Sequence, residues 1–269
     1  MCILKYLLFC CVICISCSHA SLHQKQLMHA LDFSAANSKE LEKVLKHYEH
    51  DSLKLEAAKF LIRNMPHCYS YQQGGEMDSV KRVRTYYSPF GQIDQTYARR
   101  WGHYTYRNLL KIYDAHIITA EYLIDNIDRA FDNWQKRPWN RSLSFEDFCE
   151  YLLPYRIGDE PLEEWRELYE KKYGYLLDSI YKGSDVVEAA NLVSRHLQEP
   201  VFIYCEDFEL PHIGPRYLFS HRYGSCVDAA DIVTYAFRAF LVWKIRMPEG
   251  DMYGMLFVTR QRAMYLFGI

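Results

Sequence analysis

The residues that best combine chemistry with spacing surround a single cysteine, between positions 222 and 239. Residues 222–225 are typical of a turn, and Cys226 follows them where a helical pattern begins. Behind the cysteine, apolar residues recur at intervals of three and four positions: Ala229, Ala230, Val233 and Phe237. This spacing predicts a helix that begins at Cys226 and buries one continuous face.

A cysteine in the first turn of a helix can act as a nucleophile. The unpaired N–H groups and the positive end of the helix dipole stabilise its thiolate, which is the form that attacks a carbonyl. Gly224 allows backbone N–H groups to approach a developing oxyanion closely. The alternative interpretation is that Cys226 is a small buried side chain at a tight turn.

The order Arg222-x-Gly-x-Cys226, followed by Asp-Ala-Ala-x-x-x-x-Tyr-x-x-Arg-Ala, resembles the nucleophile helix of the transglutaminase-like superfamily of papain-like cysteine enzymes. Upstream residues resemble the N-terminal portion of transglutaminase-domain lipoproteins from Bacteroidetes. They are LEAAKFLIRNMP with the Tyr-Ser-Tyr after it, AEYLIDNIDRAFDNWQKRPW and LSFEDFCEYLLPYRIGDEPLEEWR. The resemblance covers most of residues 38–239.

The resemblance implies a mainly α chain, with a helical N-terminal region followed by an incomplete α+β core. It implies amide-bond hydrolysis or acyl transfer on a peptide or protein substrate, with Cys226 as nucleophile and no cofactor. In the family a Gly-Ile-Pro-like turn follows the helix, and later strands carry the catalytic His and Asp. Neither that turn nor any histidine follows Ala239, because the last histidine is His221.

We therefore expect a truncated or frame-shifted reading after Ala239, with residues 240–269 as an aberrant tail and the chain inactive as printed. The nucleotide sequence beyond codon 239, read in the other two frames, tests this. His221 lies five residues before Cys226 and stays open as a substitute base.

The first residues have the pattern of an export signal. Lys5 precedes an apolar run from Tyr6 to Ile15, and Ser16-Cys17 follows. This resembles a bacterial lipoprotein signal, in which residues 1–16 are removed and Cys17 is lipidated. It predicts a membrane partner through the lipid anchor and a periplasm-facing place in the cell envelope. An ordinary secretion signal and an uncleaved anchor remain open.

Composition excludes other classes. A net charge of −2 and a pI near 6.6 argue against a nucleic-acid partner. We expect no metal site, because the spacing of the metal-capable residues Cys205, His212, His221 and Cys226 matches no common zinc motif. The four cysteines after Cys17 could form two disulfides in three possible pairings.

Helical periodicity organises the chain after an expected tether at 17–37. A helical region follows at 38–198, with a hairpin over 38–66, a long amphipathic stretch at 104–134 and a helix begun by Ser144. Residues 199–239 then begin the core that carries Cys226.

Two other interpretations compete with the enzyme. In the first, the chain is a non-catalytic envelope protein whose aromatic helical region binds a polysaccharide or a protein partner. In the second, the chain does not fold stably, because strands that should cover the apolar face of the Cys226 helix are missing.

Overall fold

The structure is a computed structural model and describes two compact units. Unit 1 comprises the residues up to Cys68 together with Tyr113–Leu123, and unit 2 comprises Tyr69–Ile112 and the residues from Ile124 on. The described residues are 22–75, 77, 78, 81, 108–197, 203, 204, 211–221 and 223–240. The expected signal peptide, the expected lipidation site Cys17 and residues 241–269 of the expected tail lie outside them, whereas Phe240, the first residue of that tail, is the last residue of a helix, α11 (Cys226–Phe240).

Unit 1 contains the predicted helical hairpin. It is formed by α2 (Ser38–His47) and α3 (Ser52–Asn64), joined by a turn at Asp51. The Asp51 carboxylate caps α3 by accepting a hydrogen bond of 3.1 Å from the backbone N–H of Lys54. The apolar residues of the two helical patterns form its core: Leu41, Val44, Ala58, Leu61 and Ile62. Residues 22–33, within the expected tether, are helical, and their Leu27 and Ala30 are buried.

The expected helix over 104–134 is shorter than its periodicity predicts. Helix α6 spans Ala120–Lys136, whereas Lys111–Tyr113 is a strand, β2, and pairs with β1 (Tyr69–Tyr71). The Gln72 N–H continues this pairing by donating to the Leu110 carbonyl at 2.8 Å. The prediction was wrong for this segment because pairing with a distant strand overrides local apolar spacing, and Ile and Tyr suit a strand.

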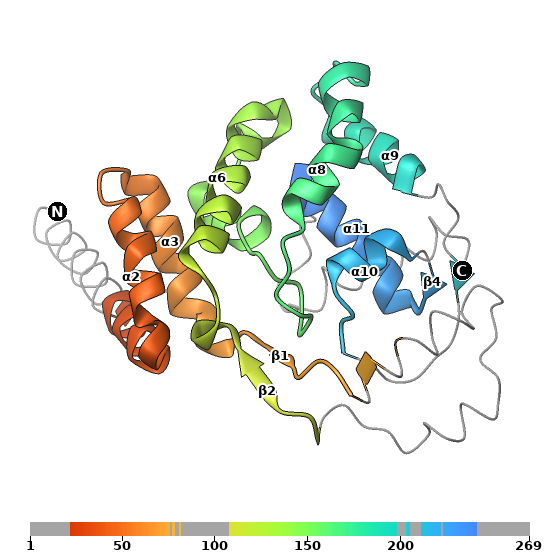
Figure 1. Cartoon of the computed structure of the whole chain (residues 1–269). Coiled ribbons are helices and arrows are strands. Elements are labelled where there is room, and N and C mark those ends of the chain that lie inside the picture. The colour runs from red at the N-terminus through yellow and green to blue at the C-terminus, as the bar shows by residue number, and fades with distance from the viewer. Residues whose placement is uncertain are drawn as a thin grey trace, which may run out of the picture. The chain divides into compact units, whose positions relative to one another are not determined.

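Unit 2 is built around α11 (Cys226–Phe240). It also contains α6 from Ile124 on, together with α7 (Phe145–Asp147), α8 (Arg166–Tyr175), α9 (Val186–Leu197) and α10 (Pro215–Ser220). Single π-helical turns, Phe148–Leu152 and Leu176–Ile180, extend α7 and α8. Figure 1 shows α8, α9 and α10 gathered about α11. Ser144 caps α7 as predicted, since its hydroxyl accepts the N–H of Asp147 at 3.1 Å.

The described residues are therefore mainly helical, as the sequence predicts. The strands in them form two two-stranded sheets, β1–β2 and β3 (Ile203–Tyr204) with β4 (Tyr223–Gly224). Nowhere in the described part of the chain is a helix both long and apolar enough to span a membrane.

Candidate functional site

Cys226 is the first residue of α11, as its position behind the turn predicts. The turn is set by Gly224, which pairs with Tyr204 in the parallel β3–β4 register and has φ of 154°, a conformation that favours glycine. Ser225 directly precedes the helix. The Asp228 carboxylate accepts hydrogen bonds from its N–H and its hydroxyl, both at 2.8 Å. The side chain of Cys226 itself lies outside the described residues.

Helix α11 is buried on more than the predicted face. Ala229, Ala230 and Val233 are buried, and Phe237 packs against the same core. On the opposite side, a polar stripe of Asp231 and Tyr235 is buried as well, and Arg238 extends it by one turn. Such a stripe needs polar partners, because burying an unpaired polar group is unfavourable.

His212 is the first of these partners. Its Nδ1 lies 2.7 Å from Asp231 Oδ2, and its backbone N–H donates to the Asp159 carboxylate at 2.9 Å. Burial lowers the pKa of His212, but the charges of Asp231, Glu160 and Asp159 outweigh burial and raise it to about 9. Burial raises the pKa of Asp231 to about 6, although His212 opposes that shift. At neutral pH the two groups form a buried ion pair.

Residues 156–160 supply a further partner, for Arg238. Glu160 is buried and accepts the N–H groups of Ile157 and Gly158, both at 2.7 Å. Arg238 donates from Nη1 to the Arg156 carbonyl at 2.5 Å. Burial raises the pKa of Tyr235 well above its usual value, and the carboxylates of Glu160 and Asp231 add to that shift. The polar stripe is thus fastened to one loop.

Sequence reasoning missed this network. It named His212 only among metal-capable residues and gave Asp231 no role. The available signal was the spacing of Asp231, Tyr235 and Arg238, at i, i+4 and i+7 on one helix. Among the residues that the structure describes, no three His, Cys, Asp or Glu side chains are placed to hold a metal ion.

His221, the sequence's candidate base, stands at the end of α10. Its Nδ1 donates to the Tyr217 carbonyl at 3.0 Å, and its ring stacks on Tyr217 with centroids 4.3 Å apart. A neutral His221 therefore carries its lone pair on Nε2. Of the cysteines after Cys17, Cys149 is buried and Cys68 is half-buried, while Cys205 lies outside the described residues.

Gly158 leaves room for the imidazole of His212, which gives a first testable prediction. A Cβ at this position would lie 2.4 Å from both Cδ2 and Nε2 of the ring, closer than van der Waals contact permits. Gly158→Ala should displace His212 from Asp231, lower the His212 pKa towards 6.5 and cost about 1–3 kcal/mol of stability. NMR titration and chemical denaturation measure the two effects.

Gly174→Ala is the matched control, because a Cβ there would meet its neighbours at 3.7 and 3.8 Å, which is ordinary contact. In a helix this change should be neutral or stabilising. An unchanged His212 pKa in Gly158→Ala would contradict the geometry of the pair.

Comparison of the chain with protein-family models, with curated proteins and with solved structures finds no match. The resemblance to transglutaminase-like enzymes therefore rests on the residues of α11 and the helices before it.

Proposed function

We propose that unit 2 carries the nucleophile helix of a transglutaminase-like enzyme, with Cys226 attacking the carbonyl of an amide in a peptide or protein. The observation that supports this is the position of Cys226 as first residue of the 15-residue helix α11, two residues after Gly224. At that position the N–H groups of the first turn have no partners within the helix and favour a thiolate.

The other residues of the motif have structural roles that suit this assignment. Asp228 holds the first turn through Ser225, and Arg238 fixes the last turn to the Arg156 carbonyl. Tyr235 is buried between them. A nucleophile on a helix fastened at both ends keeps a fixed position, which acyl transfer requires.

The chemistry proceeds in two steps. The Cys226 thiolate forms a C–S bond with the carbonyl carbon, the C–N bond breaks, and the leaving nitrogen takes a proton from solvent water to depart as an amine. Water or a second amine then takes the acyl group from the thioester. His212 is a poor base for the first step, since its pKa of about 9 keeps it protonated at neutral pH.

In the family, the catalytic histidine comes from a strand after the nucleophile helix. The printed residues contain no histidine after His221 and so do not supply this base. We also propose attachment to the cell envelope through Cys17. The test of Cys226 is accordingly chosen so that it needs no turnover.

The proposal predicts selective alkylation of Cys226. With a fluorescent iodoacetamide at pH 6, Cys226 should react at least about tenfold faster than Cys68, because only a thiol of lowered pKa is appreciably ionised at that pH. Peptide mapping of the labelled chain, with Cys226→Ala as the blank, identifies the site. Equal and slow labelling of all the cysteines after Cys17 would contradict a lowered pKa of the Cys226 thiol. It would favour the interpretation of the chain as a non-catalytic binding protein.

A further inference from the structure

Helices α6 and α8 run side by side in the same direction, joined by pairs of residues in matching register. Asn126 accepts from Arg166 at 2.6 Å, Arg129 pairs with Glu170 at 2.6 Å, and Arg137 pairs with Asp178 at 2.7 Å. In each pair, the two residues are 40 or 41 positions apart in the sequence. The same register places Asn133 opposite Gly174.

At this middle position there is no pair. Asn133 is 7% exposed, and neither its amide nitrogen nor its amide oxygen has a hydrogen-bond partner among the described residues. Gly174 has no side chain to fill the space: a Cβ there would point between the Phe240 ring and the Asp178 carboxylate. The result is a cavity of about 530 Å³ between α6, α8 and the last turn of α11.

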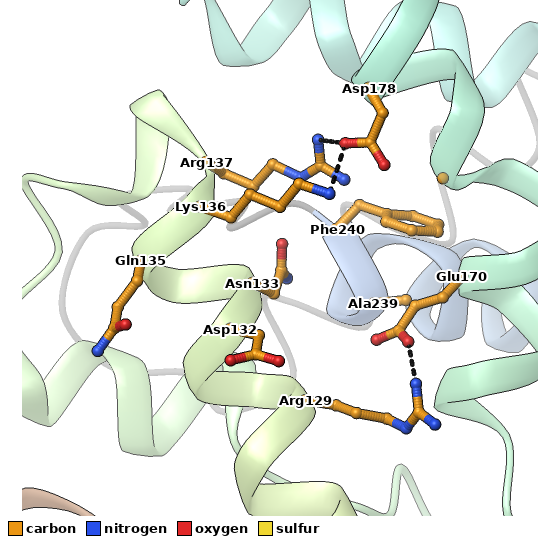
Figure 2. A pocket seen from close by; sticks show the side chains of 11 residues that line it. Arg129, Asp132, Asn133, Gln135, Lys136, Arg137, Glu170, Asp178, Ala239 and Phe240 are labelled. Carbon is orange, nitrogen blue, oxygen red and sulfur yellow. Dashed lines mark hydrogen bonds and ion pairs between the residues drawn. The ribbon is translucent and has the colours of Figure 1, made fainter.

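The two ends of the cavity differ in charge. At one end Lys136 and Arg137 share a single carboxylate oxygen of Asp178, at 2.8 and 2.7 Å, so two cations meet one anion. At the other end Arg129 meets three carboxylates, those of Asp125, Glu167 and Glu170. Figure 2 shows the Asp178 cluster and the Arg129–Glu170 pair at opposite ends, with Asn133 between them and Asp132 beside Arg129.

We propose that this cavity binds a short zwitterionic peptide of two or three residues. The peptide's carboxylate lies against Lys136 and Arg137, its ammonium against Glu170 and Asp132, and one of its amide groups pairs with Asn133. An amide is the complement of Asn133, because each offers one N–H donor and one carbonyl acceptor in the same plane.

The dimensions agree with such a ligand. Arg129 on α6 and Arg137, directly after its end, stand eight residues apart, about 12 Å at 1.5 Å per residue. A tripeptide reaches about 10 Å and a dipeptide about 7 Å, and the long Lys, Arg and Glu side chains span what remains. Binding also gives the Asn133 side chain the hydrogen-bond partners that it lacks among the described residues.

This site is distinct from Cys226. The cavity meets α11 at Ala239, which is 13 residues or about 20 Å along the helix from the cysteine. The inference therefore does not rest on the proposed function, and it holds for an enzyme and for a binding protein alike.

Calorimetric titration with Ala-Ala and Ala-Ala-Ala tests the proposal. We expect the free peptides to bind and their N-acetylated or C-amidated forms to bind at least about tenfold more weakly, because each cap removes one charge. The protein is used as the Cys226→Ala variant, so that loss of peptide binding and loss of thiol chemistry are measured separately.

Asn133→Leu provides the discriminating variant. It removes a buried amide that has no partner among the described residues, so the protein should keep or gain thermal stability while losing peptide affinity at least about tenfold. Asn191→Leu, on the exposed face of α9, is the control and should leave affinity unchanged.

Gly174→Leu, which fills the cavity, should abolish binding. The proposal is overturned if the free peptides do not bind at millimolar concentration, or if the capped peptides bind equally well. Binding of a neutral disaccharide such as cellobiose that is lost in Asn133→Leu, without binding of the peptides, would also overturn it in favour of a saccharide site.

Discussion

Arg166→Ala is expected to lower the free energy of unfolding of unit 2 by about 3–5 kcal/mol, because it removes a buried side chain that donates several hydrogen bonds. Arg166 is 3% exposed. Its guanidinium donates to the Asn126 side chain at 2.6 Å, to the Arg238 carbonyl at 2.9 Å and to the carbonyls of residues 152, 153 and 154 at 2.6–3.1 Å. One side chain therefore links α6, the π-helical turn after α7 and the end of α11.

Arg166→Ala leaves these oxygens buried without their donor, and each such group costs about 1–3 kcal/mol, less whatever water can enter. Arg166→Lys should recover only part of the loss, because an ammonium has three donors and cannot reach all five acceptors. Arg195→Ala, on the exposed face of α9, is the matched control and should change the free energy of unfolding by less than about 0.5 kcal/mol. Chemical denaturation of the three variants gives the comparison, and equal effects of the two Arg→Ala changes would refute the linking role of Arg166.

Local pattern was sufficient to predict the start of α11 and the α2–α3 hairpin. Ser144 as a cap and Cys226 as a first residue both follow from side chains that satisfy N–H groups within three positions of themselves. These interactions join residues that are close in the sequence, so they can be predicted without knowledge of the fold. The helices they begin then position the thiol, whose own surroundings the proposed alkylation must establish.

Interactions that depend on tertiary register were not predictable in the same way. His212 meets Asp231 across 19 residues that include α10, and Asn133 faces Gly174 only because α6 and α8 lie in parallel. Nothing in the local sequence marks Gly174 as facing a cavity. Asn133 differs from an asparagine on a helix surface only in being buried, which the sequence does not show. The charged pairs on either side fix the register of the two helices, and that register leaves the cavity between them.

The His212–Asp231 pair gives the second large effect, a loss of stability in alkaline solution. The His212 pKa is about 9 in the folded protein, against 6.5 for an ordinary histidine. A raised pKa means that folding favours the protonated ring. Its contribution is therefore complete below about pH 6.5 and disappears as the pH rises through 9. At 1.36 kcal/mol for each pKa unit, the loss is about 3 kcal/mol in all.

Asp231 acts in a different pH range. Burial raises its pKa to about 6 from 3.8, so ionising this carboxylate costs stability as the pH rises between those values. That cost is fully present by pH 7. Between pH 7 and 9.5 the change in stability from this pair thus comes from His212 alone, which isolates one titration within a range accessible to denaturation experiments.

Asp231→Asn distinguishes the pair from other groups that titrate in alkali. The amide keeps the size of the side chain and can still accept a hydrogen bond, but it removes the charge 2.7 Å from His212 Nδ1. We expect the variant to lose most of the decline in unfolding free energy between pH 7 and 9.5, with Glu160 and Asp159 supporting the rest. Parallel urea titrations at each pH measure both slopes, and identical slopes would mean that the buried pair is not what holds the proton. Because Asp231 lies five residues after Cys226 on the same helix, its variant also shows whether the thiol's reactivity depends on this charge.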